Sequence, residues 1–171
     1  MSYAERTVVS PEKSRAEIER ILSRYGAQGF MYGWDNGRAV IAFRAQARMV
    51  RFYLPLLDAD DRKFTTLANG YSARSKTAAT AAYEQEVRRR WRALALTIKA
   101  KLETIESGIA TFEEEFLAHL MLPNGETVAE WMAPQVEAAY LSGQMPATLP
   151  GLPAPVEKKA PRITARVVEA S

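Results

Sequence analysis

Apolar residues between positions 10 and 26 recur with the period of an α-helix. Ser10 supplies an N-terminal cap, Pro11 fits the first helical position, and Gly26 provides a flexible end after the last apolar position. We therefore predict a helix over 10–26. Its apolar face consists of residues spaced at i, i+3, i+4 and i+7, namely Ile18, Ile21, Leu22 and Tyr25.

Beyond Phe30 the period changes to two, which is typical of β-strands. The turn at 35–37 contains Gly37 and suits a tight hairpin, and Pro55 ends the last alternating run. The pattern predicts an antiparallel meander packed by the first helix. Its three alternating segments are 30–34, 38–44 and 49–54, with a second turn near 46–47, and the stretch 3–9 fits a further edge strand.

A polar stretch over 57–75 separates the meander from the longest predicted element. It is longer than most connections in compact domains, which favours a functional or mobile loop. A helix is predicted from Ser75 or Thr77 to Ser107, with a length of about 45 Å at 1.5 Å per residue. Its apolar seam is longer than a small sheet can cover and requires a second helix or another subunit. The seam residues are Tyr83, Val87, Trp91, Leu94, Ile98, Leu102 and Ile105.

Two capping boxes predict two further helices near the C-terminal end. Thr111 is followed three residues later by Glu114, and Thr127 by Glu130, so each glutamate can reach back to its cap. Pro134 is expected to break or kink the second of these helices.

The predicted fold class is therefore α+β. An antiparallel meander is packed by an N-terminal helix and a long central helix, and two C-terminal helices follow. We expect one domain over 1–145, whose C-terminal part at 109–143 is helical, and a proline-rich linker and tail over 146–171.

Composition narrows the function classes. The chain has no cysteine and one histidine, His119, which excludes disulfides, thiol nucleophiles and cysteine-ligated zinc. It has no motif for dinucleotide binding, nucleotide hydrolysis or serine hydrolysis. No apolar run is long enough to span a bilayer, and residues 1–13 lack the apolar core of a signal peptide. We expect a non-enzymatic cytoplasmic protein with no catalytic residue, cofactor, bound metal or membrane partner.

Charge is distributed unevenly along the chain. The formal net charge of +3 combines +7 over residues 1–92, −6 over 93–150 and +2 over 151–171. A basic front half favours a nucleic-acid partner, whereas opposite charges on two halves favour a protein partner or self-assembly.

Two groups of arginines can contact phosphates, one on the predicted meander and one on the long helix. Arginines beside aromatic rings on a sheet are typical of single-strand binding, because phosphates pair with guanidinium groups while bases stack. The alternative is a solvated surface of salt bridges, because Glu84 and Glu86 lie four residues before Arg88 and Arg90. The candidate phosphate contacts are Arg38, Arg44, Arg48, Arg51, Arg88 and Arg92, and the candidate stacking residues are Trp34 and Tyr53. We expect Arg44, Arg51, Arg88 and Arg92 to share one face if they act together, and different directions would count against this role.

Three acidic residues in the polar stretch suggest a weaker alternative. Asp58, Asp60 and Asp61 have the density of a magnesium site, so a metal-dependent nuclease stays open as the last-ranked function, although three acids in a loop more often form a solvated turn.

Several stretches resemble a family of short proteins encoded in tailed-phage and prophage genomes, which has no established activity. The resemblance covers residues 10–151 and lies in SRYGAQGFMYGW, RRRWRALALTIKAKLE, SGIATFEEEFLAHLMLPNGETV and GQMPATLPG. It implies a bacterial host cytoplasm and no catalytic residue. The order helix, meander, long basic helix is also loosely similar to single-strand annealing proteins of the Rad52 type, at the level of fold alone.

These observations favour a DNA-associated phage protein, such as a single-stranded DNA binding or annealing accessory in recombination. The alternative is a protein-interaction module, either a host-directed inhibitor or a self-assembling scaffold, that uses complementary basic and acidic halves. Either function is compatible with a homo-oligomer formed through the long helix.

Overall fold

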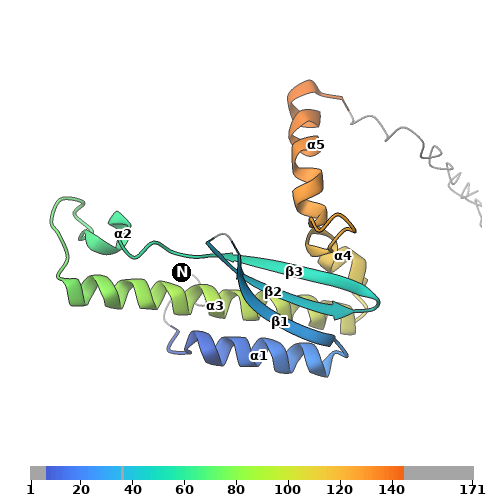
Figure 1. Cartoon of the computed structure of the whole chain (residues 1–171), viewed down its shortest axis with the longest axis horizontal. Helices are drawn as coiled ribbons and strands as arrows, with labels where there is room; N and C mark the ends of the chain where they lie inside the picture. The colour runs from blue at the N-terminus through green and yellow to red at the C-terminus, as the bar shows by residue number, and fades with distance from the viewer. Residues whose placement is uncertain (1–6, 36, 145–171) are drawn as a thin grey trace, which may run out of the picture. The chain divides into compact units, whose positions relative to one another are not determined.

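The computed structural model describes residues 7–35 and 37–144, and it confirms the α+β class (Figure 1). The helices are α1 (Pro11–Arg24), α2 (Arg62–Thr65), α3 (Lys76–Glu106), α4 (Phe112–Phe116) and α5 (Val128–Ser142), with a 3-10 turn η1 (Leu117–His119). The strands are β1 (Gln28–Asp35), β2 (Arg38–Ala45) and β3 (Arg48–Pro55).

The sheet is an antiparallel meander in the order β1-β2-β3, as predicted. The second turn places Gln46 and Ala47 at φ 48° and 59°, the two left-handed positions of a type I′ hairpin. In the stretch 3–9, Thr7–Val9 lie outside any strand, and the remainder falls outside the described residues.

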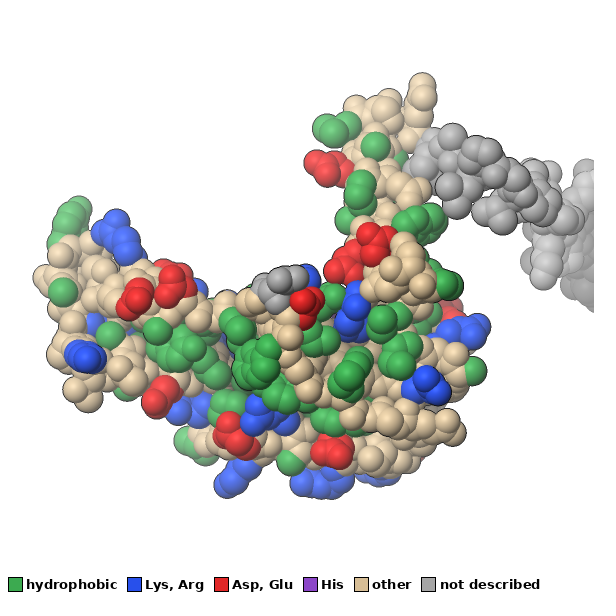
Figure 2. Space-filling view, in the orientation of Figure 1, with side chains coloured by type: hydrophobic (Ala, Val, Ile, Leu, Met, Phe, Trp, Pro, Cys, Tyr) green, Lys and Arg blue, Asp and Glu red, His purple; other side chains and the backbone are tan. Residues whose placement is uncertain are grey.

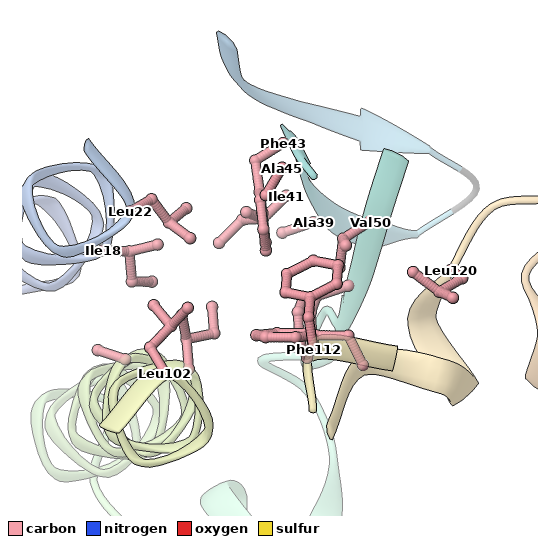
Figure 3. Close-up of a cluster of buried hydrophobic side chains, with 14 of the residues drawn as sticks. Ile18, Leu22, Ala39, Ile41, Phe43, Ala45, Val50, Leu102, Phe112 and Leu120 are labelled. Atoms are coloured by element: carbon pink, nitrogen blue, oxygen red, sulfur yellow. The ribbon is translucent and has the colours of Figure 1, made fainter. Parts of the chain in front are cut away.

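One face of the sheet is covered by α1 and α3 and forms the core. Figure 3 shows Ile18 and Leu22 of α1 and Leu102 of α3 pointing toward Ile41 and Phe43 of β2, and all five are at most 5% exposed. The predicted seam of α3 therefore finds its cover within the chain, from the sheet and from a second helix.

The two helices of this layer run parallel to each other. The Gln85 side chain, in the first third of α3, donates to the Thr7 carbonyl. At the far end, the Tyr25 hydroxyl donates to Glu106, with 2.7 Å between the oxygens. Contacts therefore advance in the same direction along both helices, which lie side by side in Figure 1.

The segment after α3 closes one end of the core. Phe116 of α4 is fully buried, and its ring meets Phe43 and Phe52 edge-on at centroid distances of 5.8 and 6.1 Å. Leu120 then forms a bridge with Val50, so the chain passes along the free edge of β3.

Both predicted capping boxes are present. Thr111 and Glu114 exchange hydrogen bonds at the start of α4, and Thr127 and Glu130 do so at the start of α5. Of the break or kink expected at Pro134, the break is wrong, because α5 continues through this residue to Ser142. The chain nevertheless divides into two compact units there, 1–133 and 134–171. The predicted tail, 146–171, lies outside the described residues.

The stretch 57–75 contains structure that the sequence pattern did not predict. It forms the short helix α2, anchored by Phe64, which is 4% exposed and packs edge-on against Tyr83 at 5.5 Å. Thr66 and Ala73 then pair as a bridge. One buried aromatic residue thus fixes this segment to α3.

Candidate nucleic-acid interface

Strand register divides the predicted site residues between the two faces of the sheet. Arg38, Arg44 and Arg51 pair with Pro55, Met49 and Ala42, whereas the alternate positions of β2 and β3 point into the core. The arginines therefore lie on the face that α1 and α3 do not cover. We call this the outer face, and its members include Met31, Asp35, Arg38, Val40, Ala42, Arg44, Met49, Arg51 and Tyr53, with Asp35 lying 3.6 Å from Arg38.

Arg38 and Arg51 stack on the ring of Tyr53, one of the two predicted stacking residues. The guanidinium carbon of Arg38 lies 3.8 Å from the centroid of the Tyr53 ring, and that of Arg51 lies 4.8 Å from it. Such contacts orient a guanidinium plane while leaving its charge intact. The Tyr53 ring is therefore engaged by protein groups.

A single carboxylate lies beside both stacked arginines. Glu130 Oε2 is 3.1 Å from Arg51 Nη2, and Oε1 is 3.9 Å from Arg38 Nη1. The Arg51 Nη2 also donates to the Gly125 carbonyl at 2.7 Å. The Thr127 backbone N–H, followed by the Thr127 hydroxyl and Arg51, holds the pKa of Glu130 below its usual value. Arg51 thus ties the turn before α5 to the sheet.

Arg44 occupies a different environment at the other end of the outer face. Its side chain is exposed and has no acidic partner among residues 7–35 and 37–144. It borders an open hollow of about 470 Å³ lined also by Met31, Ala42 and Met49. Met31 is 61% exposed, so this apolar surface with a cation at its edge is accessible.

Trp34 and Arg48 lie on the other face of the sheet. Trp34 pairs with Ala39 and packs edge-on against Tyr32 at 5.4 Å, which places it on the core side at the end of β1, where it is still 63% exposed. Arg48 pairs with Ala45 beside the turn and is exposed there. The structure does not bring these two residues together with Arg38 and Arg51.

The arginines of the long helix lie in the helical layer and have partners. Arg92 bonds to Glu17 of α1, and Arg88 pairs with Glu84 at 3.6 Å and with Gln85. Arg44, Arg51, Arg88 and Arg92 therefore do not share one face. For Arg88 and Arg92 the salt-bridged interpretation accounts for the geometry.

Intrachain pairs also join the two charged halves. Glu130 in the acidic half contacts Arg38 and Arg51 in the basic half. Part of the charge difference seen in the sequence is thus neutralised within one chain, which weakens charge attraction between subunits as a force for assembly.

The acidic triplet has local roles. Asp58 accepts from the Asp60 backbone at 2.9 Å, and Asp61 caps α2 and pairs with Lys63. Among the described residues, no group of three or more acidic or histidine side chains has the arrangement of a metal site.

His119 stacks on Phe52 with 4.0 Å between ring centroids. Its partial burial, with the nearby Lys101 charge, lowers its pKa.

Sequence reasoning missed three contributors to the outer face. Alternation within β1 could have placed Met31 opposite Phe30 and Tyr32, and similar alternation could have placed Met49. The role of Glu130 had no such signal, because it depends on a contact 79 residues away in the chain.

No family model, curated protein or solved structure matches the chain. Within the part of the chain that the structure describes, no helix has both the length and the apolar character needed to cross a membrane.

Proposed function

We propose that the protein binds single-stranded nucleic acid without catalysis, through the outer face of its sheet. The observation that carries this proposal is a sheet face that α1 and α3 leave uncovered, on which three arginines flank an aromatic ring and an apolar hollow. The resemblance to phage-encoded proteins makes single-stranded DNA in a bacterial cytoplasm, during phage recombination, the setting that we propose.

In this proposal different residues of the outer face contact the phosphates and the bases. Arg44 contacts a phosphate, and the Arg38 guanidinium plane over Tyr53 together with the Met31 side of the hollow receives unstacked bases. Methionine side chains adapt to surfaces of varied shape, which suits binding without sequence preference. A duplex hides its base faces within the stack, so these surfaces favour a single strand.

The test is binding of a fluorescein-labelled dT30 oligonucleotide, measured by anisotropy across a salt series. Replacing Arg44 with Gln should weaken binding about three- to tenfold and reduce the salt slope by about one. Arg20→Gln is the matched control, since Arg20 is an exposed cation on α1, away from the outer face. Equal effects of the two variants, or binding without salt dependence, would refute this site.

Self-assembly is the second candidate, and a separate observation favours it. Val136, Tyr140 and Leu141 of α5 are 44%, 88% and 83% exposed, and Val136 and Tyr140 lie one turn apart. Exposed apolar side chains clustered on a helix are typical of helix pairing between copies. The partner we infer is a second copy of this helix, held by apolar contact.

Light scattering at several protein concentrations separates the two functions. Assembly through α5 predicts a mass above that of the monomer that survives high salt and falls when Leu141 is replaced by Glu. Tyr71→Glu, also at a highly exposed position, controls for the added charge. A monomer at every concentration would exclude this candidate and leave nucleic-acid binding unaffected.

A further inference from the structure

Residues 62–76, which we call the basic hairpin, form a cationic segment outside the outer face. The hairpin contains α2, the bridge between Thr66 and Ala73, and the first residue of α3. It carries four cations and no acidic residue, namely Arg62, Lys63, Arg74 and Lys76. Figure 2 shows Lys and Arg side chains at this end of the molecule, the end labelled α2 in Figure 1.

Three of the cations line one concave surface. Arg62, Lys63 and Arg74 border a hollow of about 360 Å³, together with Thr66 and Gly70. Lys63 pairs with Asp61 at 3.1 Å. Neither Arg62 nor Arg74 has an acidic partner in the described ranges, in contrast to Arg88 and Arg92 on the neighbouring helix.

Local hydrogen bonds hold the backbone around this hollow in place. The Arg74 N–H donates to the Thr65 carbonyl at 2.7 Å, and the Leu67 N–H donates to the Ser72 carbonyl at 2.8 Å. The Asn69 side-chain oxygen accepts from the backbone N–H groups of Tyr71 and Ser72. The two arginines therefore project from a backbone whose geometry is fixed before any ligand arrives.

The tip of the hairpin carries an aromatic residue with no structural role in the fold. Tyr71 is 96% exposed, and it lies beside the hollow-lining Gly70. A large exposed ring next to clustered cations matches the requirements of a single strand, in which a base stacks while the adjoining phosphates pair with guanidinium groups.

We infer that the basic hairpin is a second binding surface for single-stranded nucleic acid, where Arg62 and Arg74 hold phosphates in the hollow and Tyr71 stacks on a base. This inference rests on the proposed function, because it assigns the same class of ligand to a separate part of the chain. A strand held at both surfaces gains affinity from simultaneous engagement, so long oligonucleotides should bind more tightly than short ones.

The experiment compares three variants of the full chain by anisotropy with labelled dT30. The double variant Arg62→Gln/Arg74→Gln should lose at least about fivefold in affinity and reduce the salt slope by about two. Tyr71→Ala should lose about fivefold or more with the salt slope unchanged, because it removes stacking without removing charge. Lys13→Gln/Arg20→Gln removes two exposed charges from α1 and should have a smaller effect. Circular dichroism checks that each variant is folded.

The outcomes separate this inference from the proposal for the sheet. Normal dT30 binding by the hairpin variants, combined with weakened binding by Arg44→Gln, would overturn the hairpin and leave the outer face as the site. Weakened binding by the hairpin variants with an unaffected Arg44→Gln would support the hairpin and overturn the outer face. Failure of the wild-type chain to bind dT30 at low salt would overturn both. If the hairpin double variant loses no more affinity for dT30 than the α1 control does, the loss reflects net charge alone, and the inference about the hairpin is overturned.

Discussion

Arg51 and Glu130 join the edge strand β3 to the first turn of α5, with 3.1 Å between Nη2 and Oε2. The arginine side chain is 17% exposed, so this pair is better shielded from solvent than most surface ion pairs. The same carboxylate lies 3.9 Å from Arg38. One acidic group therefore stabilises the fold and reduces the positive potential of the outer face.

Replacing Glu130 with Gln should increase the affinity for single-stranded DNA about two- to fivefold, because a competing negative charge leaves the site. Glutamine still serves in a capping box, so α5 should keep its start. The measurement is anisotropy with labelled dT30 at low and moderate salt.

Glu114→Gln is the matched control for this change. Glu114 occupies the equivalent position in the other capping box, yet it has no cationic partner among the described residues. Equal gains in both variants would mean that net charge, and not the contact with Arg51, sets the affinity.

Arg92 should matter for stability and not for binding. Its bond to Glu17 connects α3 to α1, and both side chains are largely shielded, at 21% and 27% exposed. Arg92→Gln should therefore lower the free energy of unfolding by about 1 kcal/mol. Arg88→Gln, whose partner Glu84 is 57% exposed, should lower it by less than about 0.5 kcal/mol. Urea denaturation measures the free energy of unfolding of both variants. If Arg92→Gln loses more affinity for DNA than Arg20→Gln does, Arg92 contributes to the binding site after all.

Apart from α2, the main elements of this fold were predictable because each has a local signal. Ser10 with Pro11 marks the start of α1, and the seam of α3 fixes both its length and its buried face. The strands were equally clear, since alternation and two turns define the meander. These signals depend only on neighbours in the chain.

The site was less predictable, because it depends on which face each side chain occupies and what it meets there. Alternation along β2 and β3 predicted that Arg44 and Arg51 share one face of the sheet. No local signal indicated that α3 covers the opposite face, so that Arg88 and Arg92 lie on the other side of the sheet from them. Similarly, Tyr53 was expected to be free for stacking, whereas Arg38 lies over its ring. Long-range contacts of this kind have no periodic signature.

Phe116 should be the most sensitive apolar position near the C-terminal end of the core. It is fully buried, and it joins α4 to the sheet through Phe43 and Phe52. Phe116→Ala should cost about 3–5 kcal/mol, a large share of the stability of an ordinary domain. In Phe116→Leu the leucine side chain fills more of the cavity than alanine does, so the loss in the free energy of unfolding should be clearly smaller. Thermal and urea unfolding measure the difference, and equal stability of the two variants would mean that this end of the core contributes little to cooperative unfolding.

His119 should make stability fall as the pH drops below about 6.5. Burial against Phe52, followed by the charge of Lys101, lowers the pKa of His119 in the folded chain, so folding favours the neutral ring. The unfolded chain takes up this proton near the ordinary pKa of about 6.5, and stability from this group is complete above that value. It declines as the pH falls through 6.5 toward the lower pKa of the folded state.

Carboxylates with lowered pKa, such as Glu86 and Glu130, weaken the fold only at more acidic pH, below about 4.5, so the two effects are separable. His119→Phe keeps an aromatic ring over Phe52 but cannot be protonated. Its free energy of unfolding should therefore change little between pH 7 and 5, whereas that of the wild-type chain falls. His119→Gln should be less stable throughout, because it loses the stacked ring, but should show the same flat profile. An undiminished decline in both variants would assign the pH dependence to another group.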